Sequence, residues 1–251
     1  MKIPTLISID FKRALRDSGT IFVLGIPLLM FIIFGTTTSY AEFPFGNGNV
    51  AMMTMINMAL YGATSVTVAL ASNAAVERMQ GWGRQIALTP LRDSQYVLVK
   101  VVVAGLFALL PMLAIYLTGF VTTSEAPARV WALSFVLILA GALVMALYGL
   151  FFGLALKSDS GTTIATGTLV VLSFLGNLFV PLSGTMLTIS KFTPLYGFGV
   201  IARWPLAEGA NVGMDGNAVQ ESLQLAVANF AVWALVLAAA SLWAFKRSRS
   251  R

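Results

Sequence analysis

The sequence contains no cysteine and no histidine. These absences exclude disulfide bonds, thiolate chemistry, the common zinc sites and histidine-based acid–base catalysis. Charge is also scarce, because charged residues make up only 10% of the 251 residues, against about 25% in a typical soluble domain. Hydrophobic residues make up 58%. So few charges could not cover the surface of a water-soluble globule of this size, and we therefore predict a membrane protein.

Long apolar runs take up most of the chain. A transmembrane helix needs about 20 predominantly apolar residues, and continuous runs of this length exclude the alternating strands of a membrane β-barrel. We predict an all-α polytopic membrane protein with six transmembrane helices. The expected spans are about 21–40, 51–75, 96–121, 130–156, 162–180 and 223–245.

The distribution of lysine and arginine predicts how these spans are oriented. Six spans place both termini on one side, and all but three of the 16 basic residues would then lie on that side, including those of the tail 246–251. The exceptions are Arg129, Lys191 and Arg203. The positive-inside rule therefore predicts that both termini and the tail are cytoplasmic. Because topology accounts for the net charge of +6, we predict no nucleic-acid partner.

Residues 1–20 precede the first span and have a helical pattern of their own. Ile7 and Phe11 lie on one face of a helix, whereas Lys12 and Arg16 lie on another. This pattern is typical of an amphipathic interfacial helix on the cytoplasmic membrane surface, in contact with membrane lipids. A solvated basic leader is the alternative.

The chain lacks the motifs that carry catalysis or coupled transport. It has no GxxxxGK[ST] phosphate-binding loop, no aspartate-rich metal cluster and no Ser/His/Asp set. The interiors of the predicted spans hold no ionisable residue of the kind that ion-coupled transporters use. We therefore predict no catalytic residue, no metal site and no cofactor bound by this chain. Any energy for work must come from another chain.

The polar connection between the second and third spans, residues 77–94, is more elaborate than a simple turn. Gly81 and Gly83 interrupt a continuous helix, at about 1 kcal/mol each relative to alanine, and Pro90 disfavours helical geometry at the residue before it. A short helix between them would lie across the cytoplasmic ends of two spans and suits docking to a soluble partner. The alternative is a charged turn with Trp82 anchored at the membrane interface.

This connection resembles the signature of the type-2 ATP-binding-cassette (ABC) permeases, the membrane subunits of many bacterial drug, antibiotic and polysaccharide exporters. The residues in matching register are Glu77-Arg78, Gly81, Ile86, Thr89-Pro90 and Lys100. A second phrase of the family is matched within 177–206 by Pro181, Pro194 and Tyr196. The chain departs from the family at Trp82-Gly83-Arg84, where Thr-Leu-Glu is frequent.

The resemblance implies a function as well as a topology. The chain would be the permease subunit of an exporter in the bacterial plasma (inner) membrane. It would work with a second permease copy or a paralogue and with a separate ABC ATPase subunit, which would use ATP and Mg. The chain itself would not be an enzyme. The residues implied to contact the ATPase are Glu77, Arg78, Gly81, Arg84, Ile86, Leu88 and Pro90. The alternatives are an ABC-associated component in resistance or signalling without bulk transport, or a stand-alone scaffold or channel.

A path for an amphipathic or hydrophobic substrate (a drug, antibiotic, lipid-like compound or glycan) is predicted from the methionine-rich second span, because methionine forms adaptable apolar binding surface. The candidate residues are Met52, Met55, Asn57, Met58, Tyr61 and Asn177. The alternative is ordinary helix packing for the methionines and interhelical hydrogen bonding for Asn177. Residues 182–222 would form an extracellular elaboration, either a re-entrant pair within 182–201 or a surface loop.

Overall fold

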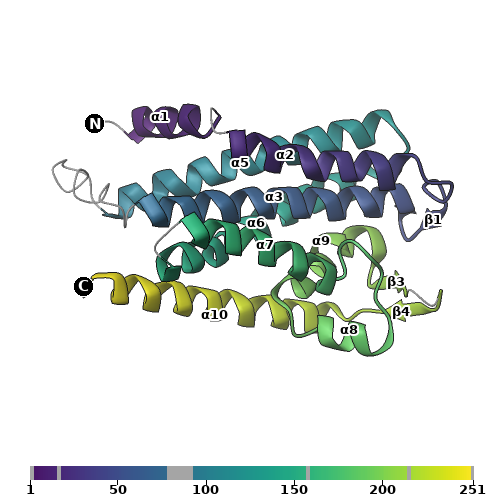
Figure 1. Ribbon diagram of the computed structural model, residues 1–251. Helices are drawn as coiled ribbons and strands as arrows, with labels where there is room; N and C mark the ends of the chain where they lie inside the picture. Colours follow the sequence, from purple (N-terminus) through teal and green to yellow (C-terminus); the bar gives the residue numbers. More distant parts are fainter. Residues whose placement is uncertain (1–2, 16–17, 78–92, 157–158, 214–215, 250–251) are drawn as a thin grey trace.

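The computed structural model describes residues 3–15, 18–77, 93–156, 159–213 and 216–249. Its long helices lie side by side in a bundle (Figure 1). The helices are α1 (Ile3–Leu15), α2 (Ser18–Phe31), the π-helix η1 (Ile32–Thr36), α3 (Val50–Glu77), α5 (Asp93–Val121), α6 (Ala128–Leu156), α7 (Asp159–Leu175), α8 (Gly184–Ser190), α9 (Pro194–Ala207) and α10 (Leu223–Arg249).

Four of the described helices, α3, α5, α6 and α10, are long and apolar enough to cross a membrane. Two further apolar helices are shorter, Gly25–Thr36 and Ser160–Leu175, and they correspond to the first and fifth predicted spans. An all-α membrane fold is thus confirmed, whereas six crossings remain a prediction. The fifth helix ends before its predicted bound at 180, because the chain leaves helical geometry at Gly176 and turns at Asn177, whose φ is 61°.

The two ends of the bundle differ in character. Both described chain ends lie at one end, which we call the terminal end, and two β-hairpins lie at the opposite, hairpin end (Figure 1). β1 (Pro44–Phe45) pairs antiparallel with β2 (Gly48–Asn49), and β3 (Ala210–Val212) pairs antiparallel with β4 (Ala218–Gln220). The sequence analysis did not predict these hairpins, because strands of two or three residues have too few positions to display an alternating pattern.

Helix α3 is the centre of the bundle. It packs against α2, α5, α6, α7 and α9, and 78% of its most apolar window is buried, compared with 17% for α10. Its closest neighbour is α6, where Gly149 and Gly153 form a GxxxG pair against the backbone carbonyls of Val68 and Ser72. A Cβ on either glycine would overlap those carbonyl groups. Small residues at this spacing let the two backbones approach, which is how membrane helices gain packing energy without a hydrophobic driving force.

Hydroxyl groups join α6 to three neighbouring helices. The Tyr116 and Ser134 hydroxyls lie 2.7 Å apart between α5 and α6, and Thr67 Oγ1 of α3 donates to the Ala142 carbonyl of α6 over 2.9 Å. Ser241 Oγ of α10 donates to the Leu147 carbonyl over 2.9 Å. Such bonds between membrane helices stabilise packing by about 0.6 kcal/mol on average. They fix which faces meet.

Helix α1 packs against the first half of α5. The rings of Phe11 and Phe107 are 4.8 Å apart, and Ile7 contacts the same apolar cluster, which includes Val99 and Val103 of α5. The face that carries Ile7 and Phe11 therefore covers protein, while Lys12 is exposed. The position of α1 relative to a membrane surface remains a prediction.

Residues 182–222 contain two short helices, α8 and α9, followed by β3 and β4. They are tied to the beginning of α10 by side chains of that helix. Asn229 accepts the Gly197 N–H through Oδ1 over 3.1 Å and donates through Nδ2 to the Lys191 carbonyl over 2.7 Å. Trp233 Nε1 donates to the Phe192 carbonyl over 3.0 Å. Helix α9 is largely buried between α10, α6 and α3, so this segment belongs to the folded core of the hairpin end.

Candidate functional site

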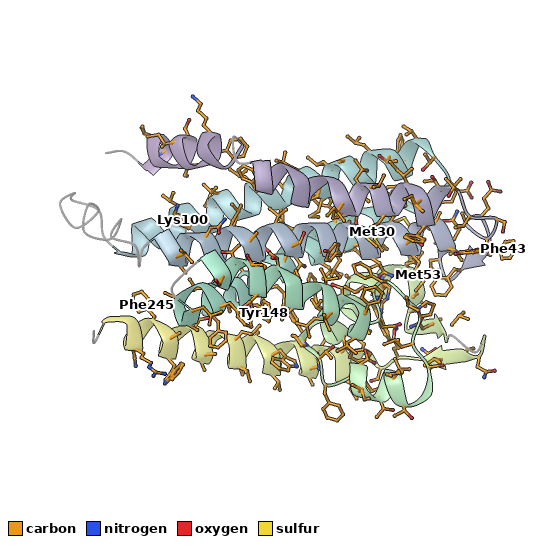
Figure 2. All side chains as sticks on the ribbon, in the orientation of Figure 1. Met30, Phe43, Met53, Lys100, Tyr148 and Phe245 are labelled. Carbon is orange, nitrogen blue, oxygen red and sulfur yellow. The ribbon has the colours of Figure 1, made fainter. Side chains whose placement is uncertain are left out.

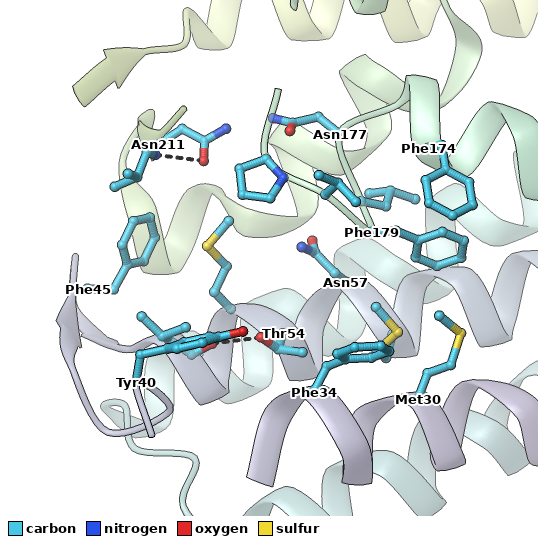
Figure 3. Close-up of a pocket in the computed structure, with 17 residues that line it drawn as sticks. Met30, Phe34, Tyr40, Phe45, Thr54, Asn57, Phe174, Asn177, Phe179 and Asn211 are labelled. Carbon is cyan, nitrogen blue, oxygen red and sulfur yellow. Dashed lines mark hydrogen bonds between the residues drawn. The ribbon is translucent and has the colours of Figure 1, made fainter. Parts of the chain in front are cut away.

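A cavity of about 500 Å³ opens within the hairpin end of the bundle. Its walls come from the end of α2 with η1, from the first two turns of α3, from the chain that follows α7, and from strand β3 (Figure 3). Helix α3 is anchored here by its N-cap residue Asn49, whose Oδ1 accepts the Met52 N–H over 2.9 Å and whose Nδ2 donates to the Thr123 carbonyl over 2.6 Å. The cap satisfies a backbone donor of the first helical turn and holds one cavity wall in place.

The walls are mostly apolar. Met30 and Phe34 face the cavity from α2 and η1, Met53 from α3, and Phe174 and Phe179 from the end of α7 and the chain after it (Figure 3). Methionine side chains fill irregular gaps because they are unbranched and polarisable. Such a surface suits the apolar body of a small organic molecule, since ligand pockets are typically apolar with a few placed polar groups.

The π-helix η1 shapes the wall that carries Phe34. The hydroxyls of Thr36, Thr37 and Thr38 donate to the carbonyls four residues earlier, over 2.7, 2.6 and 3.1 Å. The three consecutive threonines satisfy carbonyl oxygens at the end of the helix, where backbone donors run out. Single-turn π-helices occur frequently at functional sites.

Three asparagines supply amide groups to the cavity wall. Asn57 comes from α3, Asn177 from the end of α7 and Asn211 from β3, and all are at most 5% exposed. Asn57 Oδ1 accepts a hydrogen bond from Arg203 Nη1 over 3.0 Å. Figure 3 shows Asn177 and Asn211 on one side of the cavity, opposite Met30, Phe34 and Tyr40.

The hydrogen bonds at the end of α7 determine the position of Asn177. The Leu178 N–H bonds to the Ser173 carbonyl over 3.1 Å and the Asn177 N–H bonds to the Phe174 carbonyl over 3.2 Å, which is the Schellman pattern that ends many helices. The residue at the turn needs positive φ, which asparagine tolerates better than other non-glycine residues. Its Oδ1 then accepts the Leu182 N–H over 2.8 Å, which closes the turn and aims the amide into the wall.

A buried ion pair supports this wall from behind. Arg203 of α9 lies 3.6 Å (Nη2 to Oε2) from Glu221, and the two side chains are only 2% and 3% exposed. Arg203 Nη1 also donates to the Asn177 carbonyl over 3.2 Å. The separation of 3.6 Å makes this an ionic contact and not a hydrogen bond, and Arg203 Nη2 and Glu221 Oε1 have no hydrogen-bond partner among the described residues. The pair cancels the charge that either residue would bring into an apolar region.

Tyr196 lies beside this pair on α9, outside the candidate spans. Burial raises the pKa of its phenol to about 12; the Glu221 carboxylate also raises the pKa, and the Arg203 guanidinium lowers it. The phenol is therefore neutral at physiological pH. Its hydroxyl has no hydrogen-bond partner.

The structure places the predicted substrate-path residues in two groups. Asn57, Met58 and Asn177 line the cavity. Met52, Met55 and Tyr61 are buried in the core outside it, although the ring of Tyr61 contacts the cavity residue Phe179 with centroids 4.8 Å apart. The spread of these residues around α3 explains the division, because a helix turns about 100° per residue and only part of its surface can face one cavity.

Sequence reasoning missed Arg203, Glu221 and Asn211 as parts of this site. Arg203 was counted only as a non-cytoplasmic cation. The sequence does carry one signal for Arg203. It follows an apolar run, where an unpaired charge is unfavourable, so its position predicts a charged partner. Its partner is 18 residues away in sequence and belongs to another element, so only the folded chain identifies it.

The predicted ATPase-contacting residues cannot be placed in the same way. Glu77 is the last residue of α3, and Arg78, Gly81, Arg84, Ile86, Leu88 and Pro90 lie outside the described residues. Helix α3 ends and helix α5 begins at the terminal end of the bundle (Figure 1), the end opposite the cavity. Among the described residues, no group of three or more His, Cys, Asp or Glu is arranged to hold a metal ion.

The long apolar helices define the class of this protein, a multi-pass helical membrane protein, and a cavity opens at its hairpin end. Figure 2 shows side chains along the whole bundle, with Met30 and Met53 toward the hairpin end and Lys100 and Phe245 toward the terminal end. Residues 34–244 match the family model described as ABC-2 family transporter protein, and the chain belongs to this family. It is also 27% identical over 208 residues to the protein named "Putative transport permease YvfS" of Bacillus subtilis (strain 168), a match that covers 80% of this chain and 84% of that protein.

Membership of this family confirms the predicted resemblance. The chain is a permease, the membrane subunit of an ABC transporter, and a transport component rather than an enzyme in its own right. The family and the apolar helices together make it a multi-pass membrane protein.

Proposed function

We propose that this chain is the permease of an ABC exporter that moves an uncharged or amphipathic, largely apolar compound outward across the bacterial inner membrane. The observation that carries the proposal is the cavity of about 500 Å³ at the hairpin end, with apolar walls and a few asparagine amides. A site of this kind suits drug-like or antibiotic compounds, because their apolar body is buried while a few polar groups fix orientation.

In this proposal the chain crosses the membrane six times, with α2–η1 and α7 as the first and fifth spans. Both termini are cytoplasmic and the hairpin end faces outward. The distribution of basic residues supports this orientation, as does the position of both described chain ends at the end opposite the cavity (Figure 1). Two copies, or one copy and a paralogue, enclose the transport path.

The energy comes from a separate ATPase subunit that uses ATP and Mg. The 77–94 connection leaves the bundle at the terminal end and docks on this partner, with Arg84 and Glu77 meeting charges and Ile86 and Leu88 filling apolar positions. Closure of the ATPase then moves α3, which packs against five other helices and also forms one wall of the cavity. Helix α3 is therefore the element that would carry the motion from one end of the bundle to the other.

The test uses the permease purified together with the ABC ATPase subunit that is proposed as its partner. We expect the double variant Arg84→Glu, Ile86→Asp to insert into the membrane normally but to lose both association with the ATPase and substrate-stimulated ATP hydrolysis. The matched control is Arg129→Glu, a charge reversal at a site where the side chain is 65% exposed at the hairpin end, and it should leave association intact. Unchanged association and stimulation in the double variant would overturn the coupling role of this connection.

A further inference from the structure

The polar atoms of the hairpin-end cavity that lack a partner are of one kind. Asn177 and Asn211 are each 2% exposed and line the cavity. In both residues the Nδ2 atom is buried and has no hydrogen-bond partner among the residues that the structure describes. A buried amide donor left unsatisfied costs about 1–3 kcal/mol, and most buried polar groups in folded proteins have a partner.

Exchanging the oxygen and nitrogen positions of either amide would not give its NH₂ group a partner. Asn177 Oδ1 accepts the Leu182 N–H over 2.8 Å, and Asn211 Oδ1 accepts the Val212 N–H over 2.9 Å. A backbone N–H can only donate, so in each side chain the oxygen must face it and the NH₂ group must face away. The unpartnered group is therefore a donor in both cases.

The two donors come from different elements, the turn after α7 and strand β3, and both residues line the same cavity. Figure 3 shows the amides of Asn177 and Asn211 on the same side of the cavity. Each nitrogen is buried just below the cavity surface, so a seated ligand would reach it through a small rotation about the soft χ2 torsion of asparagine that keeps Oδ1 within hydrogen-bond distance of its backbone N–H.

The charge around the cavity restricts the ligand further. Among the described residues that line the cavity, there is no lysine, arginine, aspartate or glutamate. The nearest buried charge, Arg203 behind Asn57, is balanced by Glu221. A charged ligand would lose its hydration without gaining a counter-charge, which is unfavourable in an apolar site.

We propose that Asn177 and Asn211 are specificity-determining residues that select uncharged, largely apolar compounds bearing hydrogen-bond acceptor oxygens, such as ester, lactone, ketone or amide carbonyls. The proposal rests on the proposed transport function and names the class of substrate for the same cavity. Apolar compounds without an acceptor fill the same volume but leave both donors unpaired, as they are before binding. Each hydrogen bond gained is expected to strengthen binding by about fivefold.

The test compares two probes of similar shape on the full permease–ATPase complex in lipid nanodiscs. Benzyl benzoate carries an ester between two rings, and 1,3-diphenylpropane carries only hydrocarbon. Equilibrium dialysis of the radiolabelled probes, corrected for partition into empty nanodiscs, gives the two dissociation constants. We expect the ester to bind about 25-fold more tightly, which corresponds to two hydrogen bonds. Equal binding of the two probes would overturn the proposal without any variant being needed.

Variants assign the preference to the two residues. Asn177→Asp and Asn211→Asp each keep the Oδ1 acceptor for the backbone N–H and, once the carboxyl is ionised, replace the donor by a second oxygen; because burial raises the pKa of a carboxyl, binding is measured over a pH series and compared at its alkaline end. Each should reduce the ester preference by about fivefold. The matched control is Thr118→Val, which removes a hydroxyl that donates to the Ala114 carbonyl over 2.8 Å and lies outside the residues that line the cavity; it should leave the preference unchanged. An unaltered preference in both Asp variants would overturn the assignment.

Ester oxygens also occur in membrane lipids, so the source of the ligand is tested separately. We expect the affinity for benzyl benzoate to be the same in nanodiscs of diester and of diether phosphatidylcholine, because a transported compound and not a lipid ester occupies the cavity. Markedly weaker probe binding in the diester discs would identify a competing lipid and overturn that assignment. Loss of the probe preference with intact ATPase stimulation would remove only this inference, whereas loss of stimulation in the coupling experiment addresses the proposed function.

Discussion

Arg203 Nη1 of α9 donates a hydrogen bond to Asn57 Oδ1 of α3 over 3.0 Å, and this bond joins the central helix to the segment that closes the hairpin end. The two residues are 146 positions apart in sequence and both are buried. Because Arg203 also holds the Asn177 carbonyl and lies against Glu221, it organises one side of the cavity from outside its lining.

Breaking this buried pair on one side should destabilise the protein strongly. We expect Arg203→Met to reduce the free energy of unfolding by about 3–5 kcal/mol, because Glu221 is left as an uncompensated buried charge. The double variant Arg203→Met, Glu221→Leu should recover much of that loss. The measurement is thermal unfolding in detergent, followed by tryptophan fluorescence.

The control for this prediction is an ion pair on the surface of the same end. Arg129 and Glu208 are 3.9 Å apart with side chains 65% and 66% exposed, so Arg129→Met should cost no more than about 1 kcal/mol. If Arg203→Met were no more destabilising than Arg129→Met, the pair would not hold the hairpin end together.

The contact between α3 and α6 should be sensitive to a single methyl group. Gly149→Ala places a Cβ against the Val68 carbonyl, so the helices must separate or shift, and overpacking of this kind costs about 1–3 kcal/mol. We expect a lower unfolding temperature and less protein in the membrane.

Gly167→Ala provides the matched control, because nothing lies within 4 Å of the Cβ that it adds on α7. Alanine is favoured over glycine in a helix by up to about 1 kcal/mol. This variant should therefore be neutral or slightly stabilising. Equal destabilisation by the two changes would argue against close packing at Gly149.

The proposed orientation can be tested on a clean background, since the chain contains no cysteine. Ala218 of β4 and Lys246 near the end of α10 are both exposed and lie at opposite ends of the bundle. In intact cells, a membrane-impermeant maleimide should label Ala218→Cys and should label Lys246→Cys only after permeabilisation. The reverse pattern would contradict cytoplasmic termini. Asn211 is a poor reporter position because it is 2% exposed.

Much of the helical plan could be predicted from composition and run length. The runs that became α3, α5, α6 and α10 are long and weakly charged, and no soluble packing could cover so much apolar surface. The early end of α7 was harder to predict. A hydropathy window averages across Gly176 and Asn177, whereas a helix terminus is set by a single residue in the left-handed region and the hydrogen bonds around it.

The residues of the candidate site could be predicted only in part, because a polar residue stands out only within an apolar run. Asn57 and Asn177 are predictable candidates because they are polar residues within apolar runs. Asn211 lies in a short strand within a polar stretch, where an asparagine carries no signal. Its amide becomes a candidate site group only in the folded chain, where β3 places it on the same side of the cavity as Asn177 (Figure 3).

The sequence by itself determined that this chain is a membrane protein with long apolar segments, and the distribution of its basic residues predicts which way it faces. These properties follow from transfer free energies summed over long segments and from the positions of basic residues along the chain, and neither depends on tertiary contacts. The tertiary structure alone decided which polar groups meet. The pairing of Arg203 with Glu221 and the two unpartnered amides in one cavity depend on distances between elements far apart in sequence, because a hydrogen bond extends only about 3 Å and no local pattern encodes that approach.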